Sequence, residues 1–496
     1  MKLRKIVSAI SVAVMAGALM TGCGGGGGSS ETGPSASEIL SKSQEVILQN
    51  AMVARAAYSD AHATAVELQT AIATFAASPT QDNLNAAKKA WLIAREAYGP
   101  TEVYRFRASP IDSTDYATAG IDNANEEGPE GDINAWPLGE ALIDYTVTGN
   151  DFDGAADGEL GVTANGVGLN SDGSVLSGDD NIISTFTAAQ ITEDLISNTA
   201  TAEDEHDVIA GYHAIEFLLW GQDLGETVGA NTNKLRNDAV KIDYTTAGGQ
   251  RALSDFTTDA NADRRLKYLQ VAADKLVADL AGVLTEWQDN GAYFQAFTTA
   301  ADQNTANQKL IEIMTGMGKL SFGELASERM LVALRQDSQE DEHSCFSDNT
   351  HRDVALNAQG VEIAYFGDYK GYDRNLDGVI DASDGTGVAN ATTGAGFDEL
   401  LALVDKADVA QEFETLLDAT ATGYTAIDAS AREGKAFDMQ IGESIDQNNK
   451  VFTTAMALID QGLFIQDELT EAMDIDADIN SQDGATCDDQ GNCNFE

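Results

Sequence analysis

Basic residues are scarce in this chain. Among its 496 residues, 29 Lys and Arg stand against 81 Asp and Glu, which gives a formal net charge of −52. A field of this sign repels phosphate backbones, so the charge excludes nucleic acid as a partner. Because the acidic residues are spread along the chain, we expect most of them to form a solvated surface suited to a salty environment. Attraction of cations is the alternative interpretation.

Proline and alternating strand patterns are scarce as well. The chain has six prolines, and apolar residues recur instead at spacings of three and four, as in Leu84, Ala87, Trp91, Ala94 and Tyr98. A hydrophobic content of 43% is typical of a globular chain. The predicted fold class is therefore all-α. Further helical stripes cover residues 37–77, 186–200, 205–221, 262–287, 305–336, 397–421 and 440–474.

Two helical bundles are expected within one domain over residues 37–475. The first covers about 37–240 and the second about 241–475. Two insertions interrupt them, and the first is rich in Gly, Asp and Asn, which predicts a long loop. The two insertions and an acidic tail cover residues 149–181, 366–396 and 476–496.

The N-terminus lacks a hydrophobic run long enough to span a bilayer. A short basic segment precedes an apolar stretch that ends at Met20, a pattern typical of export signals. The next small residues lead into Cys23 and resemble a lipobox, although Met20 stands where leucine is usual. We therefore expect residues 1–22 to be a lipoprotein signal peptide, Cys23 to be lipidated and residues 23–36 to be a Gly/Ser-rich tether. The alternative is an ordinary signal peptide with a chance cysteine.

These features predict a protein of the cell envelope. Gly24 stands where inner-membrane retention needs an aspartate, so we expect a lipid anchor in the outer membrane, facing the periplasm. That compartment is oxidising, and Cys487 and Cys493 could close a small loop there. Cys345 would then have no disulfide partner, and other pairings stay open.

One helical stripe carries two polar groups in apolar surroundings. His213 and Glu216 lie one turn apart within residues 205–221, which are otherwise apolar nearly all round, so both side chains are expected to be buried. Burying an unpaired carboxylate costs several kcal/mol, and a bound metal offsets that cost. Imidazole and carboxylate are both good ligands for iron or zinc. The alternative is a hydrogen-bonded polar layer, and Gly211 predicts close approach of another segment.

The pattern Gly211-x-His213-x-x-Glu216 resembles the signature helix of the imelysin family. Two other blocks are similar to the family in the same order along the chain. The first comprises residues 101–106, 133–138 and 143–145, and the second residues 340–351. The resemblance covers most of residues 37–475, and the departures are the two insertions and His206.

The resemblance implies an all-α fold of two bundles with the His-x-x-Glu site in a cleft between them. It also implies a role in iron uptake, with a metal ion or a metal chelate as ligand and other envelope iron-uptake components as partners. Glu102 and Arg105, one turn apart after a Gly-Pro pair, are candidate neighbours of the site, with a local ion pair as the alternative. Asp348 and His351 are further candidates, with a capped loop as the alternative.

The second insertion carries a calcium-loop pattern. Counted from Asp373, residues with oxygen ligands stand at positions 1, 3, 5, 9 and 12 of a twelve-residue loop. Gly378 stands at position 6, where the sharp turn requires glycine, and the backbone carbonyl of Val379 would be the ligand of position 7. An aspartate replaces the usual glutamate at position 12, as in dockerin-like loops. We expect a structural Ca²⁺, the alternative being an acidic turn without metal. The side-chain ligands would be Asp373, Asn375, Asp377, Asp381 and Asp384.

The sequence contains neither His-Glu-x-x-His nor Gly-x-Ser-x-Gly, so the common metalloprotease and serine-hydrolase motifs are absent. Two groups are fewer than the three protein ligands usual in a catalytic zinc site. A metal-binding protein is therefore favoured over a metallopeptidase that would use the same His213 and Glu216. A di-iron oxidase would need paired Glu-x-x-His helices, and Glu203-x-x-His206 is only one nominal match.

Overall fold

The computed structural model describes residues 33–115, 127–145, 181–198, 208–223, 247–249, 251–336, 341–475 and 479, together with four short strands. The predicted signal peptide and Cys23 lie outside these residues. The first insertion and the acidic tail also lie mostly outside them. Their described parts are β1 (Gly168–Leu169) paired with β2 (Val175–Leu176), and β5 (Ala485–Cys487) paired with β6 (Cys493–Phe495). In the second pair Cys487 lies opposite Cys493.

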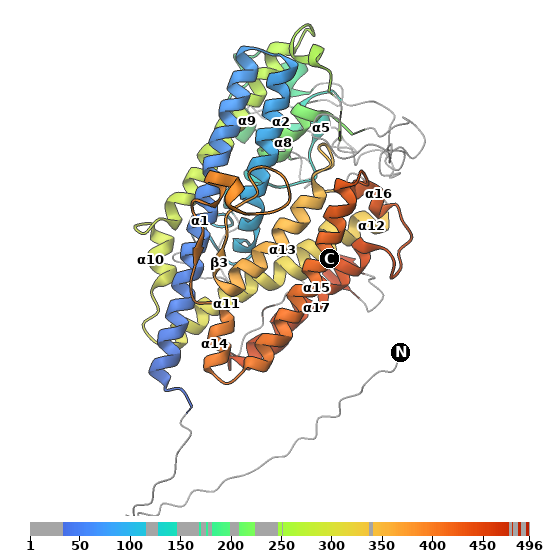
Figure 1. Ribbon diagram of the computed structural model, residues 1–496. Coiled ribbons are helices and arrows are strands. Elements are labelled where there is room, and N and C mark those ends of the chain that lie inside the picture. The colour runs from blue at the N-terminus through green and yellow to red at the C-terminus, as the bar shows by residue number, and fades with distance from the viewer. Residues whose placement is uncertain are drawn as a thin grey trace, which may run out of the picture.

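The longest helix, α1 (Ala36–Ala77), runs along one side of the whole molecule (Figure 1). It begins at a capping box in which Ser35 accepts from the Glu38 amide and the Glu38 carboxylate accepts from the Ser35 amide. Its buried face contains many alanines, which let neighbouring helices approach closely. In its upper half it packs with α2 (Gln81–Tyr98) and α9 (Ala262–Trp287), and α8 (Gly211–Trp220) packs against both of these.

The second bundle lies below the first in Figure 1 and is built around α11, α13, α15 and α17. Helix α11 (Gln303–Lys319) continues through wide turns, η5 (Leu320–Val332), into α12 (Ala333–Gln336). Helix α13 (Thr350–Phe366) packs against α15 (Ala407–Arg432), which packs against α17 (Lys450–Phe464). The all-α prediction is confirmed.

Shorter elements connect these helices. They are η1 (Gly99–Tyr104), α4 (Glu130–Ile133), α5 (Glu140–Ile143), α6 (Ile182–Thr185), α7 (Glu193–Asn198), η4 (Leu253–Phe256), α10 (Ala292–Thr298), β3 (Asp368–Tyr369), η6 (Ala382–Val388), β4 (Thr392–Thr393), α14 (Phe397–Leu403), α16 (Phe437–Ile441), η7 (Ile465–Leu469) and α18 (Thr470–Ala472). In the second insertion β3 pairs antiparallel with β4.

The predicted boundary near residue 240 needs a correction. Helix α9 follows that boundary, but it packs on α1 and α8 in the first bundle. An apolar stripe establishes that one face of a helix is buried without establishing which helix covers it. The single stripe predicted over 397–421 is likewise two helices, α14 and α15, because apolar spacing continues across the turn that contains Asp405 at φ 61°.

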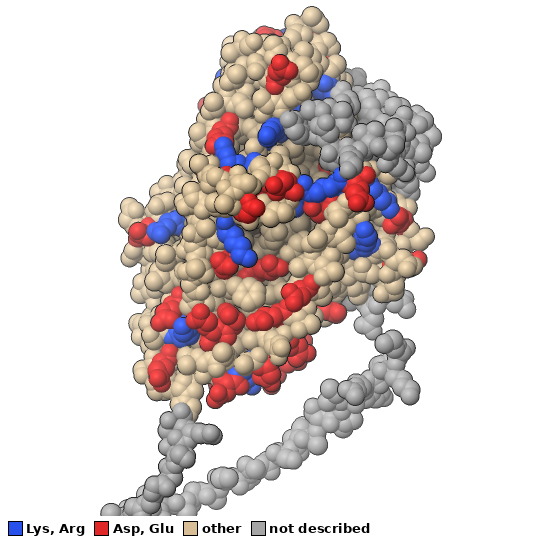
Figure 2. Space-filling view, in the orientation of Figure 1, with Lys and Arg blue, Asp and Glu red and all other residues tan. Residues whose placement is uncertain are grey.

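Within the described residues, no helix is both long enough and apolar enough to cross a membrane. Asp and Glu side chains outnumber Lys and Arg on the face drawn in Figure 2, and they are spread over it rather than gathered at one point. This distribution agrees with the expectation of a solvated acidic surface.

Candidate functional site

Gly211 begins the helix that carries the two polar groups. Its φ of +74° lies in the left-handed region, and a Cβ there would lie 2.4 Å from the Ile133 carbonyl oxygen. Helix α8 therefore starts at this glycine, rather than at residue 205, and is packed directly on α4. The predicted close approach is confirmed, but at the first residue of the helix rather than in its interior.

The side chains of His213 and Glu216 form a hydrogen bond with each other. The His213 Nδ1 lies 3.0 Å from Glu216 Oε2, and the two residues are 1% and 0% exposed. Glu216 Oε1 accepts hydrogen bonds from the Ser347 amide at 2.9 Å and the Ser347 hydroxyl at 2.6 Å. Burial raises the pKa of Glu216 well above its usual range. Both oxygens of this carboxylate are therefore already engaged by protein groups.

A second histidine, which the sequence reasoning did not select, lies beside this pair. The His343 ring centroid lies 4.6 Å from that of His213, with the rings edge to face, and Trp136 covers His343 at 4.5 Å. His343 Nδ1 lies 2.9 Å from Asp353 Oδ2, and Arg95 pairs with Asp353 at 3.1 Å. Residues 340–351 were recognised as rich in ligand-type groups, but spacing within a loop does not indicate which side chain points inward.

Electrostatics keep the two histidines neutral and Asp353 charged. Burial lowers the pKa of His213 well below its usual range and that of His343 to about 4. Burial alone would raise the pKa of Asp353, but Arg95, His343 and Ser344 together hold it well below its usual range. The Nε2 atoms of His213 and His343 are both buried and have no hydrogen-bond partner among the residues that the structure describes. Two neutral imidazoles thus lie together, each held at Nδ1 by an acidic side chain, Glu216 or Asp353.

Glu102 and Arg105 form a charged layer next to this site. Glu102 accepts from Arg329 Nη2 at 2.9 Å and from Arg105 Nη1 at 3.1 Å, and Glu324 contacts both arginines. Burial would raise the pKa of Glu102, yet Arg105 and Arg329 bring it to about 2. The Arg329 guanidinium lies 4.9 Å over the ring of Trp136, which in turn covers His343. The ion pair is therefore part of a network that reaches the histidine pair.

Asp348 and His351 occupy different places. Asp348 directly follows Ser347, and its Oδ2 accepts from the Gly248 amide at 2.6 Å. His351 Nδ1 lies 2.9 Å from the Asp348 carbonyl, and its Nε2 lies 3.5 Å from Asp428 of α15. The Nε2 of His351 thus faces α15, and from this loop it is Ser347 and His343 that contact Glu216 and His213.

The calcium-loop residues bind the amides of their own loop. Gly378 has a φ of +93°, as the sharp turn requires. Asp373 Oδ1 accepts from the Asp377 amide at 3.1 Å, and Asp384 Oδ1 accepts from the Arg374 amide at 2.8 Å. Over the part of the chain that the structure describes, no three or more His, Cys, Asp or Glu side chains are grouped so as to hold a metal ion. The loop has the backbone turn of a calcium site, with its carboxylates directed at amides.

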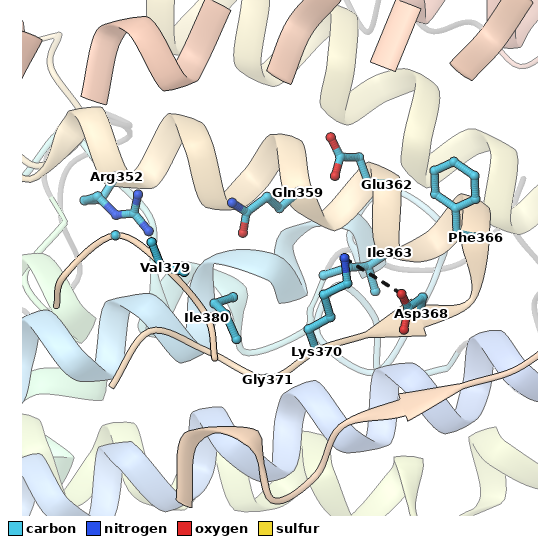
Figure 3. Close-up of a pocket in the computed structure, with 11 residues that line it drawn as sticks. Arg352, Gln359, Glu362, Ile363, Phe366, Asp368, Lys370, Gly371, Val379 and Ile380 are labelled. Atoms are coloured by element: carbon cyan, nitrogen blue, oxygen red, sulfur yellow. Dashed lines mark ion pairs between the residues drawn. The ribbon is translucent and has the colours of Figure 1, made fainter. Parts of the chain in front are cut away.

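A cavity of about 340 Å³ separates this loop from α13 (Figure 3). Gln359, Glu362 and Ile363 of α13 line it on one side, and Ile380 and Lys370 of the second insertion line it on the other. Lys370 Nζ lies 4.0 Å from Asp368, an ion pair at the same end of the cavity as Phe366. One wall of the cavity is thus formed by residues 378–380, which belong to the loop predicted to bind calcium.

The comparisons with known proteins agree with this fold. The model of the imelysin family matches residues 54–463. Iron-regulated protein A of Synechococcus elongatus is 24% identical over 317 residues, which span 62% of this chain and 60% of that relative's own length.

Two solved structures cover most of the chain. One is a candidate iron-regulated protein A precursor from Parabacteroides distasonis, with a TM-score of 0.51, 15% identity, and coverage of 89% of this chain and 97% of that one. The other is an imelysin-like protein from Psychrobacter arcticum, with a TM-score of 0.46, 14% identity, and coverage of 88% and 96%.

Proposed function

The chain belongs to the imelysin family, and from this premise we propose that it binds iron or another transition metal at the buried histidine pair. The supporting observation is the arrangement of His213 and His343, whose rings lie 4.6 Å apart. Both Nε2 atoms are buried and lack a hydrogen-bond partner within the described part of the chain. Neutral imidazole nitrogen is a common metal ligand. In this proposal the two Nε2 atoms hold the metal.

In this proposal the carboxyl groups of Glu216 and Asp353 support metal binding indirectly, by positioning the two histidines. Metal-ligating histidines usually donate their other ring N–H to a carboxylate, which fixes the tautomer and the ring orientation. Glu216 occupies that position for His213 and Asp353 for His343. Glu216, expected from the sequence to be a direct ligand, is on this interpretation a positioning residue, because both of its oxygens are engaged.

A metal chelate fits this donor set better than a bare ion. Two protein nitrogens leave several coordination positions of a transition metal to be filled by other atoms, and a chelate brings its own oxygens. A peptidase would need more, since catalytic zinc sites usually have three protein ligands. The name of the relative from Synechococcus elongatus associates that protein with iron regulation, which supports iron as the metal here.

The proposed location is the cell envelope, with Cys23 as the lipid anchor in the outer membrane and the domain facing the periplasm. A tether of Gly and Ser between the anchor and α1 would let the domain reach other iron-uptake components.

The experiment measures binding of ferric citrate and of Zn²⁺ by the purified chain, using calorimetry and metal analysis. We expect His213→Ala and His343→Ala to abolish binding, and Glu216→Gln to weaken it by roughly 10- to 100-fold, the usual effect of losing a supporting carboxylate. His351→Ala is the matched control, because that histidine is equally buried but directed at Asp428. Unchanged affinity in both His213→Ala and His343→Ala would refute the site.

The same variants test the alternative function. Hydrolysis of an unstructured protein is measured with and without added metal. Hydrolysis that requires both the metal and His213 would favour the metallopeptidase. Binding without hydrolysis supports the binding protein.

A further inference from the structure

Arg107 is a buried cation far from solvent. It follows η1 in the chain and is 1% exposed. Its guanidinium carbon lies 4.9 Å from the ring centroid of Tyr104, 5.6 Å from that of Trp287 and 5.1 Å from that of Phe297. Aromatic rings from η1, α9 and α10 therefore surround the charge.

The guanidinium donates a hydrogen bond of 3.1 Å from Nη1 to Asn50 Oδ1 of α1, and the Tyr293 side chain also interacts with it. Its Nε and Nη2 are buried and, over the part of the chain that the structure describes, have no hydrogen-bond partner. Among the described residues no carboxylate forms an ion pair with it. Glu312, close enough to interact electrostatically with Arg107, is held by Lys309 at 2.7 Å.

Other buried arginines of the same chain provide a direct comparison. Nε and Nη2 form one edge of the guanidinium, the edge that matches a carboxylate. In Arg352 this edge binds the two oxygens of Glu96 at 2.7 and 2.8 Å, and in Arg265 it binds those of Asp144 at 2.7 and 3.1 Å. Arg95 and Arg329 direct the same edge at Asp353 and Glu324. In Arg105 and Arg251 the Nε is likewise without a partner among the described residues, but their Nη1 atoms pair with Glu102 and Asp144. Arg107 departs from all of these, because no carboxylate of the described residues pairs with its guanidinium.

Neighbouring groups in the cluster are also donors without partners. They include Asn50 Nδ2, the Tyr58 and Tyr104 hydroxyls, and Trp287 Nε1. The rings of Tyr58, Tyr104 and Trp287 pack together with centroids 5.6 to 6.3 Å apart. Cation–π contacts offset part of the cost of burying the charge but do not satisfy its N–H groups. Asp112 is the nearby carboxylate, but it interacts with the Arg107 backbone amide, and burial raises its pKa to about 7. The Nε/Nη2 edge of Arg107 is therefore open to a ligand that accepts hydrogen bonds and carries negative charge.

We propose that Arg107 and Asn50, enclosed by Tyr104, Trp287 and Phe297, form a binding site for a small carboxylate or similar oxyanion. The anion would bind the Nε/Nη2 edge as Glu96 binds Arg352. The site joins α1 of the first bundle to α10 and to the later turns of α11, where Gly316 lies against Arg107, so binding would stabilise the junction. It is independent of the histidine pair.

The experiment compares the thermal unfolding of the full chain in formate, acetate, inorganic phosphate and chloride at equal ionic strength. We expect at least one of the three oxyanions to raise the midpoint over chloride by about 2 °C or more, in a saturable way. Arg107→Met, which keeps the aromatic packing and removes the charge, should lose this response. Arg265→Met, which removes a paired buried arginine, should keep it.

Asn50→Asp provides a second, opposite test, because it places a carboxylate where Asn50 Oδ1 now contacts Arg107. This variant should have a higher midpoint than the wild type in chloride and should no longer respond to the oxyanions. Circular dichroism checks that both variants are folded. The absence of an oxyanion-specific shift in the wild type, or an equal shift in Arg107→Met, would overturn the proposal.

Discussion

Burial lowers the pKa of three histidines of this chain below the ordinary value of histidine. His213, His343 and His351 are between 1% and 4% exposed. Burial lowers the pKa of His351 to about 4 from its ordinary value of 6.5, with Asp428 opposing the shift. A histidine with a lowered pKa in the folded state binds its proton more readily when unfolded. Its contribution to stability is therefore complete above pH 6.5 and is lost as the pH falls toward about 4.

This yields a prediction at the scale of one residue. His351→Gln removes the titrating group, so the free energy of unfolding of the variant relative to the wild type should rise as the pH falls from 6.5 to about 4. The change should approach roughly 3 kcal/mol, from about 1.4 kcal/mol for each pKa unit. Urea unfolding of both proteins at several pH values measures it. Glu216, whose raised pKa changes stability with pH in the opposite direction, is present in both proteins, so its contribution cancels in the comparison. A difference in unfolding free energy between variant and wild type that stays constant across this pH range would contradict the prediction.

At the scale of elements, the loop of residues 373–384 combines the turn of a calcium loop with carboxylates that bind its own amides. Its carboxylates accept from loop amides, and Gly378 already adopts the positive φ of a calcium loop. Calcium would replace these amide contacts by stronger bonds to several oxygens at once. The loop also forms one wall of the cavity against α13 (Figure 3).

We therefore predict that calcium protects residues 366–396 from limited proteolysis, compared with the same chain in chelator. Asp377→Ala should remove the protection, since it deletes the ligand of position 5. Asp368→Ala is the matched control, an acidic residue of the same insertion outside the loop. Mass spectrometry of the fragments locates the cleavage. Equal cleavage of the wild type in calcium and in chelator would count against the site.

At the scale of the whole molecule, charge is the dominant feature. A formal net charge of −52, spread over the surface as Figure 2 illustrates for one face, makes the folded state repel itself. Salt screens this repulsion, with a Debye length near 10 Å at about 0.1 M and about 3 Å at 1 M. The prediction is an unfolding midpoint that rises by a few degrees between about 0.05 and about 0.5 M salt.

Calorimetry in NaCl and in KCl measures this rise, and the two salts should act alike because screening depends on ionic strength. An effect confined to one cation would indicate specific binding instead. A midpoint that falls or stays constant with salt would show that the repulsion is not significant in the folded state.

The sequence by itself determined the local features of this protein. Helix α9 lies at residues 262–287 as predicted, because the spacing of apolar side chains is a property of neighbouring residues along the chain. The burial of His213 and Glu216 followed from the apolar residues around them, and the close approach at Gly211 from its lack of a side chain. Three separated blocks were sufficient to identify the family.

Only the tertiary structure decided which groups meet. Ser347 reaches Glu216 across 131 positions of the sequence, and Arg95 reaches Asp353 across 258. His343 lies beside His213, whereas His351 faces Asp428 of α15, and no spacing along the chain distinguishes the two histidines. The same holds for α9, which joins the first bundle, and for Arg107, whose carboxylate-matching edge has no partner. Contacts of this kind depend on how whole helices pack, and that packing is set by all their surfaces together.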